Sequence, residues 1–536
     1  MPFRQCYPQN LKLLRIFGVP RLVSIPQHRN RSEFESQIHR KIRIAEMKGD
    51  FVNANVNVDR NAVQRQQAID AALHHFDSGD FLRDLERRVA FRTESQNPAQ
   101  ADALGAYLSD EIAPALAQLG FTSRLAANPV NARAPFLIAE RIEDPALPTV
   151  LTYGHGDVVR GYDDQWRAGL APWRVSVEDD RWYGRGCADN KGQHSVNFAA
   201  LAAVLAAREG KLGYNVKVIF ETGEEIGSPG LDEVCAAERD ALAADVFIAS
   251  DGPRVSAQRP TIFLGSRGGV TFELLIDLRE GAHHSGNWGG ALRNPAIVLS
   301  HAIASLVDRQ GAIAVEGLRP PPVPASVRAA LADIELGGDE NAPAVDADWG
   351  EPGLTPTERV IAWNTLEVLA FKSGNPDAPV NAIPPRAQAT CQLRFVVGTD
   401  YQRVGEHLEA HFARLGFADV RVRVTQTAAA TRLDPDDAWV HWALDSLRAS
   451  TGKKPALLPN LGGTVPNDVF AETLGLPTLW VPHSYPACAQ HAPNEHLLGS
   501  VARESLAVMA GLWFDLGEDA KRLASGSASA ESTAAR

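Results

Sequence analysis

The stretch at residues 151–157, LTYGHGD, constrains the fold most, because it has the pattern of a buried strand that ends in a polar turn. A further short apolar run occurs at residues 136–139, buried strands are expected at 216–220 and 245–249, and an Ala-rich helix is expected at 192–207. Strands that alternate with helices predict a mostly parallel sheet with helices on both faces. In such sheets, ligands bind beyond the carboxyl ends of the strands. The sequence therefore predicts an α/β fold with a site near His155 and Asp157.

Acidic residues and a second histidine lie in turns marked by glycine or proline, several of them directly after predicted strands. These residues are Asp189 in GRGCADNKG, Glu224 and Glu225 in ETGEEIGS, Asp251 in ASDGP, and His491 in QHAPNE. Carboxylates that cluster at strand ends repel one another unless cations neutralise them. Two histidines with several carboxylates suit Zn²⁺, Mn²⁺ or Co²⁺, and one carboxylate can bridge two ions about 3.5–4 Å apart. The set therefore predicts a site for two metal ions.

Each of these segments has an ordinary structural explanation when it is taken alone. A Glu-Glu pair usually lies on a solvated surface, and an HxD sequence usually forms a capped turn. Asp251 before Gly-Pro has the pattern of a simple turn residue. The metal-site interpretation depends on all the segments occurring together, each in a turn of this kind.

Composition and charge exclude several classes of protein. The 536 residues are enough for two domains with tails, and 45% hydrophobic with 22% charged residues is typical of a globular protein. A net charge of −12 argues against a nucleic-acid partner, and no apolar run reaches the roughly 18 residues that a membrane span requires. Five cysteines without a CxxC spacing indicate a reducing compartment, so we expect a cytoplasmic protein.

A change of pattern after Gly265 indicates an inserted domain. Alternating strands are expected at 270–278, 386–397 and 420–424, helices at 294–307 and 401–415, and a Pro-rich acidic loop at 318–356. This order predicts an α+β domain within the α/β core. The predicted parts are a disordered or wrongly assigned extension at 1–60, with Met1 and Met47 as alternative starts, a catalytic domain at 61–264 and 429–520, the inserted domain at 265–428, and a disordered tail at 521–536.

The motifs resemble those of the co-catalytic zinc metallo-exopeptidase family that includes carnosinase, acetylornithine deacetylase, succinyl-diaminopimelate desuccinylase and carboxypeptidase G. The matching strings are TYGHGDVV, WYGRGCADNKGQ, IFETGEEIGSPG, ASDGP and QHAPNE. The resemblance extends over about residues 81–514. It implies a zinc-exopeptidase-like catalytic domain with an inserted ferredoxin-like domain that serves as lid or dimerisation domain.

This resemblance implies a role for each residue of the predicted metal site. Asp189 would bridge two divalent ions, with zinc expected and manganese or cobalt as alternatives. His155 and Asp251 would complete one ion, and Glu225 and His491 would complete the other. Glu224 would be the general base that acts on a metal-bridging water, and Asp157 would orient His155. The Asp189–Asn190 peptide would be cis, as in the family.

The resemblance also links residues outside the metal site to the substrate. His284, in GAHHSGNWGG, would reach into the site of a partner subunit and stabilise the oxyanion, with His283 as the less favoured candidate. Arg394 would pair with a substrate carboxylate. Further matches to substrate-side positions are Asn294, Asn381, Gly463 and Thr464. Thr464 stands where relatives have serine, so the identity of the substrate stays open.

The predicted activity is metal-dependent hydrolysis of a peptide or N-acyl amide bond in a small substrate with a carboxylate, such as a dipeptide or an N-acyl amino acid. We expect a homodimer that binds neither nucleic acid nor membrane. One alternative is an aminopeptidase without a lid, which the inserted block argues against. Another is a non-catalytic metal-binding relative, which would be expected to have lost a ligand or the base.

Overall fold

The computed structural model describes residues 51–337 and 342–534. The chain divides into two compact units, Met1–Val63 and Gln64–Arg536. Residues 51–63 are the described part of the first unit, and they are helical. The sheets and the site described below belong to the second unit. None of the helices in the described part of the chain is long and apolar enough to cross a membrane.

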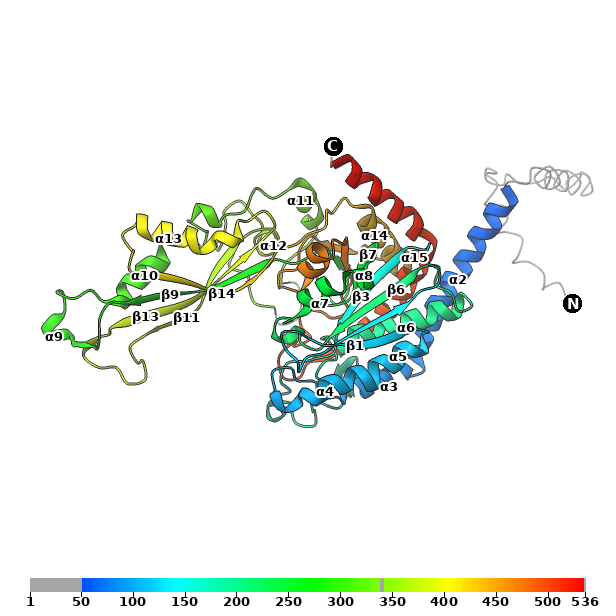
Figure 1. The fold of residues 1–536 in the computed structure, drawn as a ribbon, viewed down its shortest axis with the longest axis horizontal. Helices are drawn as coiled ribbons and strands as arrows, with labels where there is room; N and C mark the ends of the chain where they lie inside the picture. Colours follow the sequence, from blue (N-terminus) through cyan, green and yellow to red (C-terminus); the bar gives the residue numbers. More distant parts are fainter. Residues whose placement is uncertain (1–50, 338–341, 535–536) are drawn as a thin grey trace, which may run out of the picture. The chain divides into compact units, whose positions relative to one another are not determined.

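An eight-stranded sheet forms the centre of the catalytic domain, in the order β1-β2-β6-β3-β7-β16-β8-β15 (Figure 1). Its strands are β1 (Thr122–Ala126), β2 (Phe136–Arg141), β3 (Thr149–His155), β6 (Asn215–Glu221), β7 (Val246–Ala249), β8 (Thr261–Phe263), β15 (Ala456–Leu458) and β16 (Thr478–Trp480). The central strand β3 pairs in parallel with β6 and β7, and β16 continues the parallel pairing beside β7. The predicted α/β class with a mostly parallel sheet is therefore confirmed.

Helices cover both faces of this sheet, which explains why its central strands are mostly apolar and buried. Val150 packs into one core and the next residue, Leu151, packs into the other. The first core contains α3 (Asp80–Val89), the π-helical turn η3 (Tyr107–Ile112), α5 (Ala113–Gln118), α6 (Lys191–Ala207), α14 (Ala438–Thr451) and α15 (Gly499–Ala534). The second contains α7 (Leu231–Ala237), α8 (Arg239–Leu242), α11 (Ala325–Leu331), α12 (Pro356–Ile361) and the π-helical turn η8 (Val469–Thr473).

The inserted domain, called the lid below, contains a four-stranded antiparallel sheet in the order β11-β13-β9-β14 (Figure 1). Its strands are β9 (Gly268–Asp277), β11 (Thr365–Ser373), β13 (Arg386–Phe395) and β14 (Arg421–Ala428). Helices α10 (Pro295–Ala304) and α13 (Val404–Arg414) pack with these strands in one hydrophobic core. The chain order is β-α-β-β-α-β, which is that of a ferredoxin-like domain, as expected. The sequence interpretation missed β11.

Two smaller sheets connect loops to this framework. In the lid, β10 (His283–His284) pairs with β12 (Ala382–Ile383). In the catalytic domain, β17 (His496–Leu498) pairs with β5 (Arg181–Tyr183), and β5 pairs with β4 (Ser176–Glu178). Through β17, residues 496–498 join the C-terminal part of the chain to the segment before Asp189.

Both predicted disordered ends need correction where the structure describes them. The C-terminal tail continues α15 to Ala534, because Ala520 and Leu523 are still buried in the core and alanine favours helix in the following stretch. At the other end, residues 51–60 lie within α2 (Phe51–Asp77), a segment without the glycine or proline that would interrupt a helix. Residues 1–50 of the predicted extension lie outside the described residues.

Candidate metal centre

The candidate ligands lie at one edge of the central sheet because parallel strands end there together. His155 is the last residue of β3, and Asp251 follows the end of β7 by two residues. Glu224 and Glu225 form a short 3-10 turn after β6. Asp189 lies just before α6, and the Asp189–Asn190 peptide is cis, as expected.

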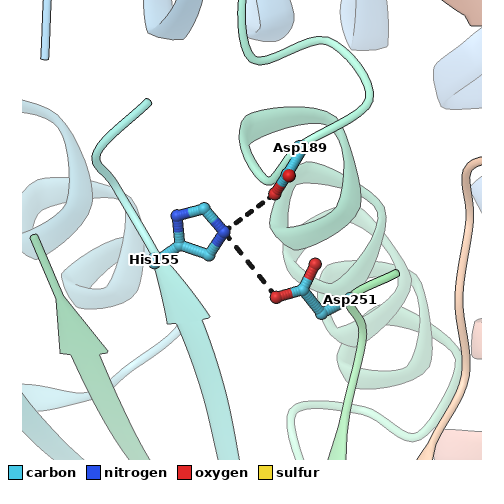
Figure 2. A group of neighbouring side chains, drawn as sticks. All are labelled: His155, Asp189 and Asp251. Carbon is cyan, nitrogen blue, oxygen red and sulfur yellow. Dashed lines mark hydrogen bonds and ion pairs between the residues drawn. The ribbon is translucent and has the colours of Figure 1, made fainter. Parts of the chain in front are cut away.

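One group of possible ligands consists of His155, Asp189 and Asp251 (Figure 2). His155 Nε2 lies 2.9 Å from Asp189 Oδ1 and 3.6 Å from Asp251 Oδ2. Figure 2 shows the same edge of the imidazole ring facing both carboxylates. All three side chains are buried, so their charges have almost no contact with water that would solvate them.

A second group consists of Asp189, Glu225 and His491. His491 Nε2 lies 3.1 Å from Asp189 Oδ2 and 3.0 Å from Glu225 Oε2. His491 adopts a left-handed backbone conformation with φ 62°, which is unfavourable for a residue with a Cβ. The two carboxylate oxygens of Asp189 thus face different groups, as a residue shared by two ions requires.

The electrostatics of the two groups fit divalent cations. Burial, followed by the charge of Asp189, raises the pKa of Glu225 to about 7 and that of Asp251 to about 6. Burial would also raise the pKa of Asp189, but its hydrogen bonds with His155 and His491 hold it far below the usual value. Hydrogen bonds to Asp189 and Glu225 raise the pKa of His491 to about 11. The cluster therefore favours positive charge, and nitrogen with carboxylate oxygen is a donor set that suits zinc, manganese or cobalt.

Asp157 connects the two groups of ligands through its backbone and its side chain. His155 Nδ1 donates a hydrogen bond to the Asp157 carbonyl oxygen at 3.0 Å, and the Asp157 carboxylate is more distant at 3.4 Å. That carboxylate instead accepts the backbone N–H groups of Glu224 at 3.2 Å and Glu225 at 3.1 Å. The support expected for His155 thus comes mainly from the backbone, and the side chain fixes the turn that carries both glutamates.

Glu495 is a supporting residue to which the sequence interpretation gave no role. Its buried carboxylate accepts the backbone N–H groups of Gly186 at 3.0 Å, Ala188 at 2.9 Å and Asp189 at 3.2 Å. It also pairs with the buried Arg185 guanidinium at 2.7 Å. The available signal was its place in QHAPNE, four residues after His491. Glu495 therefore fixes the backbone of Asp189 from the loop that supplies His491.

Glu224 and Arg394 line a common cavity of about 470 Å³ between the metal ligands and the lid. Glu225, His491 and Thr464 also line it. Burial raises the pKa of Glu224 well above its usual value, so this carboxylate has an increased affinity for a proton. Arg394 Nη1 donates a hydrogen bond to Thr464 Oγ1 at 2.6 Å. The cavity thus brings together a candidate proton acceptor, candidate metal ligands and a guanidinium group.

The other predicted substrate residues do not line this cavity. The exposed His284 accepts a hydrogen bond from Gly286 N through Nδ1, and Asn294 caps α10 by accepting one from Ala296 N. Asn381 accepts a backbone bond from Ser285 N beside β10, and Gly463 is exposed next to Thr464. Arg394 is paired with Gly269 at the start of β9, whereas His284 follows the far end of this strand. Ten residues of strand extend about 33 Å, so His284 does not meet Arg394 within one chain.

Comparison with known proteins identifies the family. The model of Peptidase family M20/M25/M40 matches residues 151–515, which is more than half of the chain. The chain belongs to this family. As an M20 family protein it is a metallohydrolase that acts on amide bonds of small substrates.

Individual relatives and solved structures agree with this assignment. Cysteinylglycine-S-conjugate dipeptidase of Corynebacterium striatum is 29% identical over 333 residues, 60% of this chain and 70% of the relative. Beta-Ala-His dipeptidase of Homo sapiens is 28% identical over 388 residues, 68% of this chain and 74% of the relative. The M20 family metallo-carboxypeptidase Sso-CP2 from Sulfolobus solfataricus aligns with a TM-score of 0.69 at 25% identity, covering 81% of this chain and 98% of that chain.

Proposed function

We propose that this protein hydrolyses dipeptides with a free terminal carboxylate, using two divalent ions. Zinc is the expected metal, and manganese and cobalt are alternatives; N-acyl amino acids are the second substrate class. The observation that carries the proposal is the cavity that Glu224, Glu225, His491 and Arg394 line together. Relatives named as dipeptidases support the choice of dipeptides over N-acyl amino acids.

The metal ions would be held by His155, Asp189 and Asp251 on one side and by Asp189, Glu225 and His491 on the other. When bound, such ions polarise a carbonyl group and lower the pKa of water. Glu224 would take the proton from the attacking water and deliver it to the leaving amine, so the amide becomes a carboxylate and a free amino group. Burial raises the pKa of Glu224, which increases the affinity of this carboxylate for the proton that it would take from water.

Arg394 would bind the substrate's terminal carboxylate, because a guanidinium pairs with both oxygens of a carboxylate. Its contact with Thr464 fixes the guanidinium from the catalytic domain. An aminopeptidase has no need of this cation beside the site, since its substrates are recognised by their amino end. A non-catalytic relative would have no need of Glu224.

His284 would act in the site of a partner subunit of a homodimer. Its distance from Arg394 within one chain supports a role in trans. The edge strand β11 of the lid exposes Val368, Leu369 and Phe371, which favours association of lids. A cytoplasmic location is also proposed, because the buried cysteines Cys187, Cys235, Cys391 and Cys488 are free thiols.

The test is a hydrolysis panel on the full-length protein after chelation and reloading with Zn²⁺, Mn²⁺ or Co²⁺. The panel contains dipeptides, the same dipeptides with an amidated C-terminus, and N-acetyl amino acids. We expect turnover only after reloading, and a loss of activity of at least about 10-fold on amidation, because a charge-assisted hydrogen bond disappears. Equal rates for free and amidated dipeptides would contradict the role of Arg394. No turnover with any metal would contradict the proposed activity.

A further inference from the structure

A second cavity, of about 380 Å³, lies next to the first on the lid. Arg394 and Gln392 line both cavities, so the two spaces adjoin at β13. Arg267, Glu367 and residues of the segment 345–364 line the second cavity only. The proline-rich acidic stretch, which has no part in the chemistry proposed above, thus supplies much of the wall of a space next to Arg394.

The polar face of the lid sheet explains how two guanidinium groups come to lie in this region. In β13, Cys391 and Leu393 point into the lid core, and Gln392 and Arg394 point away from it. Gly269 is paired with Arg394 in the sheet, and Arg267 lies two residues before Gly269. Because alternate residues share a face, Arg267 and Arg394 emerge on the same side.

Arg267 is a buried cation without a carboxylate partner among the described residues. Only 7% of its surface is exposed. Its Nε donates to the Gly462 carbonyl oxygen at 3.0 Å, and Nη1 lies 3.4 Å from Thr365 Oγ1, both of which are neutral acceptors. Burial and the nearby charge of Arg394 lower the pKa of Arg267 to about 10, and Glu367 opposes this effect without forming an ion pair.

The third arginine that lines the second cavity, Arg359, already has partners. Arg359 donates to the backbone carbonyls of Ala347, Trp349 and Glu351, and so it holds the wall in place. Arg267 differs because a buried charge is costly unless an opposite charge compensates it. This cost would be relieved by an anion that enters the cavity.

We propose that the second cavity binds an acidic side chain of the substrate's C-terminal residue, with Arg267 as its carboxylate partner. Arg394 takes the terminal carboxylate at the boundary of the two cavities, and the glutamate or aspartate side chain extends into the second. Ile313, Val360 and Trp363 supply apolar contacts for its methylene groups. The inference rests on the proposed dipeptidase function and specifies the substrate class.

The experiment compares alanyl-glutamate with alanyl-glutamine and alanyl-phenylalanine on the metal-loaded full-length protein. Glutamine has nearly the shape of glutamate without its charge. We expect kcat/KM for alanyl-glutamate to exceed that for alanyl-glutamine by about 10-fold or more, as a charge-assisted contact predicts. Arg267→Gln should remove this preference by lowering only the alanyl-glutamate value.

A second variant removes the preference without altering Arg267. Thr365→Asp places a carboxylate beside the guanidinium at nearly constant volume, so it should compete with the substrate's acidic group. Arg386→Gln is the matched control, because Arg386 is exposed at the opposite end of β13 from Arg394. The control should keep the preference, and thermal unfolding of all three variants reports on their folding.

Calorimetric binding of the product amino acids to the metal-loaded protein separates this inference from the proposed function. Glutamate should bind more tightly than glutamine to the unaltered protein. The Arg267→Gln variant should bind glutamate and glutamine with equal affinity. If no dipeptide is hydrolysed but this difference is found, the proposed function fails and the acidic-group site stands. Three outcomes would overturn the acidic-group site while the proposed function stands. Dipeptides could be hydrolysed without a preference for alanyl-glutamate, the preference could persist in Arg267→Gln, or alanyl-phenylalanine could be the preferred substrate.

Discussion

Glu495→Gln tests whether the loop that supplies His491 also fixes the shared ligand Asp189. The substitution keeps the size of the side chain and one acceptor oxygen, which can still accept the backbone N–H groups of Gly186, Ala188 and Asp189. It removes the negative charge opposite the buried Arg185 guanidinium, which is 2.7 Å away. The amide NH₂ would then face a cation that has lost its partner.

The expected loss of stability follows from that geometry. Removing one partner of a buried ion pair costs about 3–5 kcal/mol, and the retained hydrogen bonds place this variant near the lower end of that range. The expected effect on metal binding is larger than that of a remote substitution, because Asp189 belongs to both ligand groups. Changes to residues that orient metal ligands lower affinity about 10–100-fold. We expect this reduction for both ions.

The assay is competition with a chelator, followed by metal analysis, alongside urea unfolding of the metal-free protein. The matched control is Glu111→Gln, which breaks the buried Arg88–Glu111 pair without touching the loop before Asp189. The control should lose a similar amount of stability and keep its metal affinity. If Glu495→Gln binds both ions as tightly as the unaltered protein does, the role given to Glu495 is wrong.

Three further predictions concern the candidate site. Glu224→Gln should lower kcat by about 10²–10⁴-fold with both metals retained, measured by turnover and metal analysis, and wild-type turnover would exclude it as the base. His155→Ala should lose one ion per subunit, whereas Asp157→Ala should displace the Glu224 turn and weaken metal affinity and rate about 10–100-fold; equal metal loss in both variants would contradict this division. His284→Ala mixed with Glu224→Gln subunits should recover about a quarter of the wild-type activity, since only mixed dimers hold one complete site. No recovery after proven subunit exchange would refute action in trans.

The central sheet could be predicted because burial leaves a local pattern in the sequence. Runs such as VFIA at residues 246–249 are apolar throughout, since Val150 and Leu151 in the neighbouring β3 show that both faces of the sheet are covered. Strand β11 was not predicted, because it lies at an edge of the sheet and exposes Val368, Leu369 and Phe371. Its sequence therefore shows neither the alternation of apolar and polar residues nor the apolar run of a buried strand. Its identity as a strand depends on pairing with β13, which lies later in the chain.

The candidate metal ligands were predictable because each follows a strand or lies in a marked turn, and parallel strands bring such turns together. Their support was harder to predict. Glu495 contacts a backbone segment 306 residues earlier in the chain, and no local sequence pattern indicates which backbone segment it will contact. The contacts of Asp157 were equally hard to predict, because its carboxylate accepts the backbone N–H groups of Glu224 and Glu225, which lie far from it in the sequence.

The discontinuity of the catalytic domain has a consequence for biosynthesis. A growing polypeptide that has reached Asp251 already contains His155 and Asp189, so it holds every residue of the first ligand group. The second group requires His491, and the anchoring of Asp189 requires Glu495, both near the end of translation. Under the proposed two-ion site, a protein truncated before these residues would bind at most one ion and would lack the anchor for Asp189. With the ligand groups proposed above, metal loading would be completed only after nearly the whole chain has left the ribosome, so an incomplete chain would not become an active hydrolase.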